Sequence, residues 1–506
     1  MPAIIDASNS IDINVLDSIL SADQADLKAV HDKFYAGVEE LKLLLLDNAI
    51  LFCPTSMGKD STTALLMALE AYRELISTGQ IEASRPLISS TVNTGMESIV
   101  MNLYVVYARK RLLAYAKQHN INLQHEIIMP PLNDQYFVRF VGGQKLIPNS
   151  SRAGDCSIIL KIKPSEAFVK SVLAKTQHQG VKVIAVVGSR TEESARRAGN
   201  MRQQGIGSKS INDLRDELTQ INLGSTVLHN FAPLRDWSTD DVFSFLRIAG
   251  AKPLTKTAFT IPAFLSSHGL LVELYGNGSR ETCSIAIGQA TAGAGCNGKA
   301  RFGCTQCSMI GAIDQSSTAL AQYERWRVLG VENATRLRDY LFRLSTDMNA
   351  RAFHARAYDS AAFSRIALQP NTLKPKHLEK LVRYAAQLTL DSKRAAKEFR
   401  DLVSQGREMD HPGMREIADD VNLPPKTKAA FLEMYREGIT DPRNLNYLFD
   451  TNHAILLSFR WAIDGIGAAP FRPLAILRQL ESGQGWLPYP QLNSEIEQRT
   501  GQKVKI

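Results

Sequence analysis

Short apolar runs and longer amphipathic stretches alternate along the first half of the chain. Five apolar runs predict strands, at residues 49–54, 87–92, 124–129, 181–188 and 226–229. Stretches with helical apolar spacing lie between or after them, at 61–77, 97–118, 165–177, 192–198 and 240–249. Strands that alternate with helices are typical of a parallel sheet with helices on both faces. The predicted fold class is therefore α/β, with a twisted parallel sheet that binds its ligands at the carboxyl ends of the strands.

The rest of the chain follows other patterns. Residues 25–46 have helical apolar spacing and few breakers, which predicts a helix. The second half of segment 252–315 is rich in Gly, Ala, Thr and Cys, which indicates an irregular loop that something else must hold together. From 316 onward the composition is helical and basic. We therefore expect four parts: an N-terminal helical segment (1–46), an α/β domain (47–251), a cysteine-rich loop (252–315) and a helical C-terminal domain (316–506).

Length and composition indicate a soluble enzyme of more than one domain. A chain of 506 residues exceeds the size at which single cores stop growing, and 44% hydrophobic with 22% charged residues is an ordinary balance. No apolar run approaches the ~20 residues that span a bilayer, so we expect a cytoplasmic protein without a membrane partner. The net charge of +8 favours polyanionic partners, although a solvated basic surface explains it equally well.

A hydroxyl-rich turn, Thr-Ser-Met-Gly-Lys-Asp-Ser-Thr at residues 55–62, joins the first predicted strand to a helix. Gly58 lets the backbone approach a phosphate, and the helix N-terminus offers free N–H groups. Further donors are the side chains of Ser56, Lys59, Ser61 and Thr62. No glycine stands five positions before Gly58, so the turn is not a Walker A loop. The alternative is a serine-rich helix cap in which Asp60 favours the first turn.

This turn resembles the PP-loop of ATP pyrophosphatases, which cleave ATP between the α and β phosphates. Four later segments are similar to segments of the subgroup that includes phosphoadenylylsulfate reductases, at 92–97, 156–164, 188–197 and 233–242. The first of them departs from that group's Asp-Thr-Gly…Glu turn, because Asn93 stands in place of Asp. The matches occur in the same order and cover residues 45–250. They imply a PP-loop fold, like that of adenine nucleotide alpha hydrolases, for the α/β domain.

The same resemblance implies roles for individual side chains. It places ATP at Ser56, Gly58, Lys59, Asp60, Ser61, Thr62, Thr94, Glu97, Arg190, Ser194, Arg197 and Asp236. It makes Lys59, Asp60, Arg190, Glu193 and Cys156 the catalytic candidates. Arg190 and Arg197 can neutralise phosphates bidentately, while Glu193 can instead brace one of them.

Some of these roles have alternatives. Glu97 or Asp60 could hold the Mg²⁺ that ATP cleavage needs. Asp236, with the tryptophan after it, is equally consistent with a turn that starts a helix and packs an aromatic ring. Cys156 could relay sulfur or serve as an alternative cluster ligand.

Four of the six cysteines fall within 25 residues and predict a metal or redox site. They are Cys283, Cys296, Cys304 and Cys307, with 12, 7 and 2 residues between them. Four thiolates suit zinc or an iron–sulfur cluster, and spacing alone does not choose. Cys53, on the first predicted strand, is more typical of a small buried hydrophobe.

Residues 296–308 resemble the Cys…Ser-Arg-Phe-Gly-Cys-x-x-Cys-Thr segment of the DndC family of bacterial DNA phosphorothioation, with Ala300 and Ser308 in place of Ser and Thr. The resemblance to this family, and to the related SspD-type proteins, covers residues 45–315. It implies a [4Fe–4S] cluster on the four clustered cysteines, with ATP and Mg²⁺ as further cofactors. The implied partners are DNA, a cysteine desulfurase as sulfur donor, and other proteins of the phosphorothioation complex.

The sequence therefore predicts an enzyme that cleaves ATP to AMP and pyrophosphate and uses the adenylated DNA backbone for sulfur insertion. A phosphoadenylylsulfate reductase is the first alternative, but the PP-loop is intact here and no cysteine follows Cys307. A non-catalytic nucleotide sensor would be expected to lose Lys59 or Asp60. Transfer-RNA thiolation stays open as a variant with RNA as acceptor. Basic stretches at 325–327, 336–338 and 393–400 fit either a nucleic-acid track or solvated helix faces.

Overall fold

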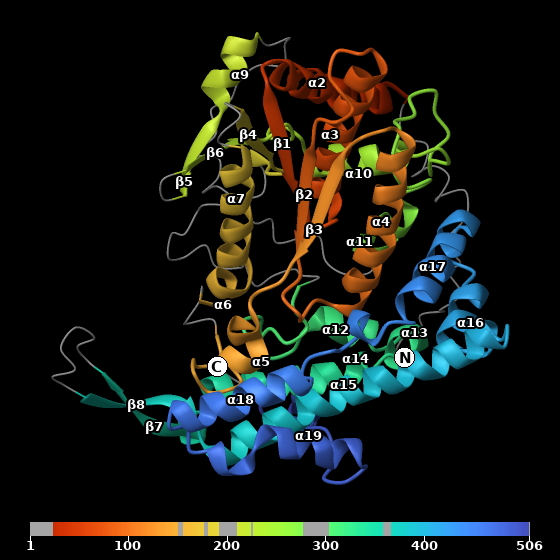
Figure 1. Cartoon of the computed structure of the whole chain (residues 1–506). Helices are drawn as coiled ribbons and strands as arrows, with labels where there is room; N and C mark the ends of the chain where they lie inside the picture. Colours follow the sequence, from red (N-terminus) through yellow and green to blue (C-terminus); the bar gives the residue numbers. More distant parts are fainter. Residues whose placement is uncertain are drawn as a thin grey trace, which may run out of the picture.

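A six-stranded sheet forms the centre of the N-terminal half of the molecule (Figure 1). The computed structural model describes residues 24–149, 155–176, 181–191, 210–223, 226–276, 303–357 and 366–504. The strands are β1 (Ala49–Pro54), β2 (Leu87–Val92), β3 (Leu123–Ile128), β4 (Lys182–Val186), β5 (Thr219–Leu223) and β6 (Thr226–Phe231). Their order is β3-β2-β1-β4-β6-β5, and every neighbouring pair is parallel except β5 with β6. The predicted α/β class with a mostly parallel sheet is confirmed.

Helices cover both faces of this sheet because its central strands are apolar on both sides. The covering helices are α2 (Gln24–Leu46), α3 (Lys59–Ser77), α4 (Ile99–Gln118) and α10 (Thr239–Ile248) on one face, and α7 (Lys163–Thr176) on the other. Along β1, Leu51 belongs to the core of the first face, whereas Ile50 and Phe52 belong to the core of the second. Such continuous apolar strands are typical of a parallel sheet buried on both faces.

The remaining helices form a layer below the carboxyl ends of the strands (Figure 1). Small helices lead into it from the α/β part, at α5 (Tyr136–Arg139), α6 (Asp155–Ser157) and α11 (Gly269–Gly276), whereas α9 (Ile211–Glu217) lies at the opposite end of the sheet, against α2 (Figure 1). The layer contains α12 (Gln315–Leu320), α13 (Glu324–Arg327), α14 (Val331–Thr346), α15 (Pro375–Ser404), α16 (Pro412–Asp419), α17 (Pro425–Gly438), α18 (Thr451–Ile463), α19 (Pro473–Glu481) and α20 (Asn493–Thr500). A hairpin of β7 (Arg351–Ala357) and β8 (Ile366–Leu373) extends from it.

The strands and helices expected at 25–128, 165–188 and 226–249 agree with the structure to within two or three residues. The sequence prediction missed the antiparallel edge strand β5, the β7–β8 hairpin and the short helices α5, α9 and α11. The predicted helix at 192–198 lies outside the described residues. None of the helices in the described part of the chain combines the length and apolar composition that a membrane crossing requires.

Two of the basic stretches are largely structural. Arg325 is 4% exposed and pairs with Asp420 at 3.0 Å, and Arg338 is 0% exposed. Arg336 pairs with Glu495 at 2.6 Å. These three arginines therefore belong to the interior and to ion pairs, and do not form a nucleic-acid track. In the third stretch, Lys397 remains on the surface, where it pairs with Asp401.

Candidate functional site

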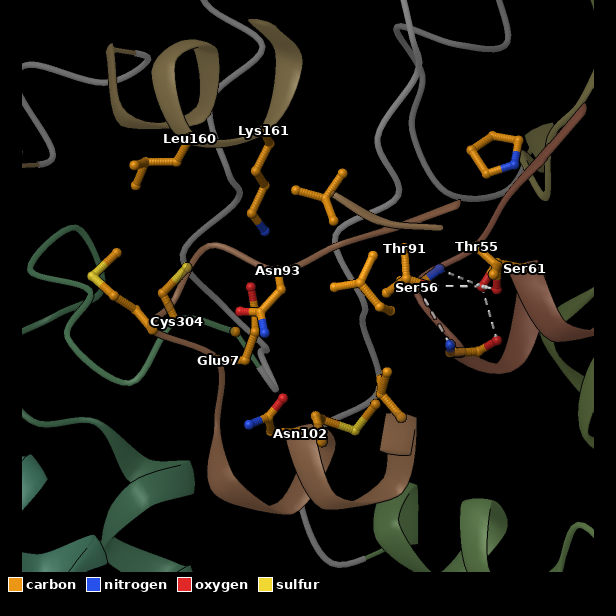
Figure 2. Close-up of a pocket in the computed structure, with 18 of the residues that line it drawn as sticks. Thr55, Ser56, Ser61, Thr91, Asn93, Glu97, Asn102, Leu160, Lys161 and Cys304 are labelled. Carbon is orange, nitrogen blue, oxygen red and sulfur yellow. Dashed lines mark hydrogen bonds between the residues drawn. The ribbon is translucent and has the colours of Figure 1, made fainter. Parts of the chain in front are cut away.

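A cavity of about 810 Å³ opens at the carboxyl ends of the parallel strands, in the size range of small-molecule sites. It is lined by the turn after β1, the turn after β2, the residues after β4, the start of α7 and segment 303–309. Figure 2 shows the hydroxyl groups of Ser56 and Ser61 at one end and Cys304 near the other. The position agrees with the rule that open α/β sheets bind ligands at this edge.

Hydroxyl groups of the turn after β1 point toward one another in the cavity wall. Ser61 Oγ lies 3.2 Å from Ser56 Oγ and 3.3 Å from Thr55 Oγ1 (Figure 2). Gly58 is the N-cap of α3, and among the described residues no side chain caps this helix. The N-terminus of this 19-residue helix lies in the cavity wall with hydroxyl groups beside it, a position that suits an anion. This turn, residues 55–62, is called the cradle below, and its binding of phosphate stays a prediction.

Lys59, Asp60 and Arg190 form a buried ionic cluster behind the cradle. Lys59 Nζ donates to Asp60 Oδ2 at 2.5 Å, and Arg190 Nε donates to Asp60 Oδ1 at 2.7 Å. Their side chains are 1%, 5% and 2% exposed. Arg190 also donates to the carbonyl of Trp237 at 3.3 Å. Asp60 lines the cavity, whereas Lys59 and Arg190 are not among its lining residues. In this structure the two cations hold Asp60 and the base of the cradle, instead of facing the ligand space.

Gly188 is required where the chain after β4 crosses the first turn of α3. A Cβ atom at this position would lie 2.8 Å from the backbone carbonyl of Asp60 and 2.9 Å from the amide of Ser61. Real Cβ contacts are not this short, so only glycine fits without a backbone shift. The Gly188–Ser189 peptide therefore forms the wall directly beside the cradle.

The turn after β2 places a carboxylate in the cavity. Glu97 Oε1 accepts from Thr94 Oγ1 at 2.8 Å, and the Gly95 amide donates to Asn93 Oδ1 at 2.8 Å. The amide oxygen of Asn93 therefore supplies the acceptor that an Asp side chain would supply at this position. Both oxygens of Asp60 accept from cations, so Glu97 is the better placed of the two candidates for Mg²⁺.

Backbone pairing brings the cysteine-containing segment to the same turn. Glu97 and Cys304 form an antiparallel bridge, and the Thr305 amide donates to the Met96 carbonyl at 2.7 Å. The Ser98 amide donates to the Gly303 carbonyl at 3.2 Å. As a result, Cys304 Sγ lies 3.7 Å from Thr94 Oγ1. Two motifs about 200 residues apart in the sequence thus meet in one wall of the cavity (Figure 2).

Three cysteines line this end of the cavity: Cys156, Cys304 and Cys307. Burial raises the pKa of the Cys304 thiol to about 12, although the charge of Lys161 opposes the shift. Burial also raises the pKa of Cys156, whose Sγ lies 3.6 Å from Met309 Sδ. Lys161, from the segment that resembles Cys…Lys-x-x-Pro, points into the space beside Cys304 (Figure 2).

The described residues supply only part of the predicted cluster site. Cys283 and Cys296 lie outside them, and within the described ranges no set of three or more His, Cys, Asp or Glu side chains is arranged to hold a metal ion. Cys304 and Cys307 have soft sulfur donors that suit iron or zinc, and both line one cavity. The two thiols are therefore suitable ligands for an iron–sulfur cluster, and the presence of that cluster stays a prediction.

The loop that carries Cys307 is fixed by an arginine that sequence reasoning did not single out. Arg338, on α14, donates to the carbonyls of Cys307 at 2.9 Å, Ile310 at 2.6 Å and Ala312 at 2.7 Å, and also to that of Gly311. The neighbouring Gln306 is fully buried and donates to the Ala334 carbonyl at 3.2 Å. In the sequence Arg338 is one cation of a basic stretch, and no local signal indicates this role.

Other predicted site residues lie elsewhere or outside the description. Asp236 is 41% exposed, does not line the cavity, and precedes Trp237, which lies just before α10 and packs against Phe245 within that helix. This favours the alternative of a helix-starting turn. Thr62 is buried in α3 behind the cradle. Glu193, Ser194 and Arg197 lie outside the described residues.

A scan against protein-family models finds no match to this chain, and a search of curated proteins finds none either.

Proposed function

We propose that this protein is an ATP pyrophosphatase and sulfurtransferase that activates the DNA backbone for phosphorothioate modification. The observation that carries the proposal is the shared cavity, which has the cradle at one end and three cysteines at the other. A phosphodiester has no good leaving group, so replacing a non-bridging oxygen by sulfur requires prior activation of that oxygen. A site that binds ATP beside sulfur-carrying groups supplies both requirements in one place. The choice of DNA as acceptor comes from the sequence resemblance to the DndC family.

The proposed reaction has two displacements. First, a non-bridging oxygen of the phosphodiester attacks the α-phosphorus of ATP, and pyrophosphate leaves with the electron pair of the broken P–O bond. Second, hydrosulfide attacks the phosphodiester phosphorus. A cysteine desulfurase carries its sulfur as a persulfide, so a thiol reductant first supplies the two electrons that release hydrosulfide from it. AMP then departs with the original oxygen, so sulfur replaces oxygen and no net oxidation occurs.

Different residues of the cavity would serve different parts of this reaction. The N-terminus of α3 and the hydroxyls of Ser56 and Ser61 would bind the β and γ phosphates. Glu97 would hold Mg²⁺ against the phosphates. Lys161 lies where its positive charge can stabilise the anion that forms between the cradle and Cys304. The buried cluster around Asp60 would keep the cradle rigid.

An iron–sulfur cluster would supply redox-active iron and sulfide at the cysteine end. Cys304 and Cys307 would hold it, together with Cys283 and Cys296, and with Cys156 as an alternative ligand that lines the same cavity.

The first test concerns ATP cleavage by the purified protein with Mg²⁺. We expect AMP and pyrophosphate as products. Changing both Ser56 and Ser61 to Ala removes two phosphate donors that now bond each other. Ser61 Oγ also accepts from Thr55 Oγ1 and from the Ser56 amide, so thermal unfolding of the variant is measured alongside its activity. Two charge-assisted hydrogen bonds of about 1.5 kcal/mol each predict roughly 100-fold lower kcat/KM. Ser77→Ala, at the far end of the same helix, is the control and should leave the rate unchanged. ADP and phosphate as products would contradict the proposal.

The second test concerns the acceptor. A strain without the gene should lose phosphorothioate dinucleotides, as measured by mass spectrometry of nuclease-digested DNA. The wild-type gene should restore them, whereas the Ser56→Ala/Ser61→Ala and Cys307→Ser versions should not. If phosphorothioates persist while tRNA thiolation or sulfate assimilation fails, the acceptor is RNA or the protein is a phosphoadenylylsulfate reductase.

A further inference from the structure

An apolar stripe lies on the outer face of α18. Ile455, Phe459 and Ile463 recur every four residues, so they share one side of the helix. They are 41%, 63% and 74% exposed, whereas Leu457 and Trp461 on the opposite side are fully buried. Single exposed apolar residues need no explanation, but three in a row on one helix face mark a surface that binds something.

A basic groove adjoins this stripe. It has a volume of about 590 Å³ and lies between α18 and α19, which pack side by side (Figure 1). Ser458, Leu474 and Ala475 form part of its lining, and its two charged lining residues are Arg472 and Arg478. Among the described residues, no carboxylate forms an ion pair with either guanidinium. The stripe and the groove together are called the α18 face.

The inner side of α18 packs against the segment that supports the cysteine end of the cavity. Trp461 Nε1 donates to the Gly142 carbonyl at 2.7 Å, and His453 Nε2 lies 2.7 Å from Gln135 Oε1. Between these two contacts the chain forms α5, whose Tyr136 lines the cavity. The α18 face is thus one helix layer away from the cavity wall.

We propose that the α18 face is a docking site for a protein partner whose contacting segment is an amphipathic helix with acidic residues beside its apolar side. Apolar anchors at helical spacing next to a groove are the surface that such a helix recognises. The two unpaired arginines favour acidic flanks in the partner. A second copy of this chain fits less well, because a two-fold contact through the face would place like-charged arginines near one another in a protein of net charge +8.

The test uses a defined probe and the full-length protein. A fluorescent helical peptide of ~18 residues, with leucines along one side and glutamates beside them, is compared with a peptide in which lysines replace the glutamates. We expect anisotropy titrations to show at least about tenfold tighter binding of the acidic peptide, weakening with salt. Phe459→Ser should weaken binding about tenfold or more, and Arg478→Glu should abolish the preference for the acidic peptide.

Val421→Ser is the control, because Val421 is an apolar residue with an exposed fraction of 89% that lies between α16 and α17, away from α18 (Figure 1). It should leave binding unchanged. Equal binding of the two peptides, or an equal effect of Val421→Ser, would overturn the proposal. A dimer in light scattering that Phe459→Ser converts to a monomer would overturn it in favour of a second copy as the occupant. None of these outcomes depends on ATP cleavage, so the proposed function is tested separately.

Discussion

Lys59 is the residue whose position differs most from its expected role. The sequence suggested a mobile charge that reaches a phosphate, but the side chain is 1% exposed and contacts Asp60. A buried carboxylate must be compensated, and here two cations share that task. The motif spacing could predict the turn, because strand, turn and helix are local. It could not predict which side of the turn each charge occupies, because that depends on Arg190, 130 residues away.

We predict that Lys59→Ala destabilises the fold as well as any nucleotide complex. Loss of one cation leaves Asp60 only partly compensated in a buried site, which should lower the free energy of unfolding by about 3 kcal/mol. Urea denaturation would measure the change. Lys28→Ala, which removes an exposed i,i+4 pair with Asp32, should cost less than about 1 kcal/mol. Similar losses in both variants would show that the cluster around Asp60 contributes no special stability.

Gly188→Ala should disturb the cradle through steric contact alone. Its Cβ would press on the Asp60 carbonyl and the Ser61 amide, and relieving that overlap should cost about 1–3 kcal/mol. Thermal unfolding and ATP binding should both be weakened. At Gly311 an added Cβ meets nothing within 4 Å, so Gly311→Ala serves as the control. If the two variants unfold at the same temperature, the close crossing of the two segments is not present in solution.

At the level of elements, the apolar pattern predicted the strands whose burial is visible in their own sequence. It missed the strands whose conformation depends on pairing with a neighbouring strand. The central strands were predictable because runs such as that of β1 are apolar on both faces. In β5 only Ile221 and Leu223 are buried, so the strand shows only a weak alternating pattern. The β7 sequence, Arg-Ala-Phe-His-Ala-Arg-Ala, consists largely of residues that also suit helices, and its strand form depends on pairing with β8.

Arg338 gives a prediction about the loop that carries Cys307. Arg338→Met should leave several buried carbonyls without donors, lower the free energy of unfolding by about 3–5 kcal/mol and increase hydrogen exchange in residues 307–312. Any iron bound by the purified protein should fall in parallel. Arg336→Met, on the same helix but in partly exposed pairs with Glu332 and Glu495, should cost about 1 kcal/mol or less. Unchanged exchange in the Arg338 variant would show that other contacts hold the loop.

At the scale of the whole molecule, buried histidines make the fold sensitive to acid. Burial lowers the pKa of His268 to about 4, and burial together with the charge of Arg109 lowers the pKa of His125 to about 4. An unfolded histidine titrates near 6.5. Between these values the unfolded chain binds protons that the folded protein does not bind, so the free energy of unfolding falls as the pH drops.

We therefore predict that the protein is less stable at pH 5 than at pH 7, by on the order of 1–2 kcal/mol for each of these histidines. Urea denaturation at the two pH values measures the difference. Carboxylates with lowered pKa values change the free energy of unfolding only below about pH 5, so they do not contribute to this difference. His268→Leu should be less sensitive to pH than the wild type, and an identical pH dependence would exclude His268 as a cause.

The short backbone pairing between residues 96–98 and 303–305 fixes the position of Cys304 relative to the turn after β2. Each residue of an extended chain advances about 3.3 Å, and successive side chains point to opposite faces. A slip of one residue would turn Cys304 away from Thr94 and bring a neighbour in its place, with every chemical group still present in the chain. Insertions outside the paired residues do not change the register of this pairing. The chain is thus free to change length around the site while the spacing between the turn after β2 and Cys304 is held by three residues on each side.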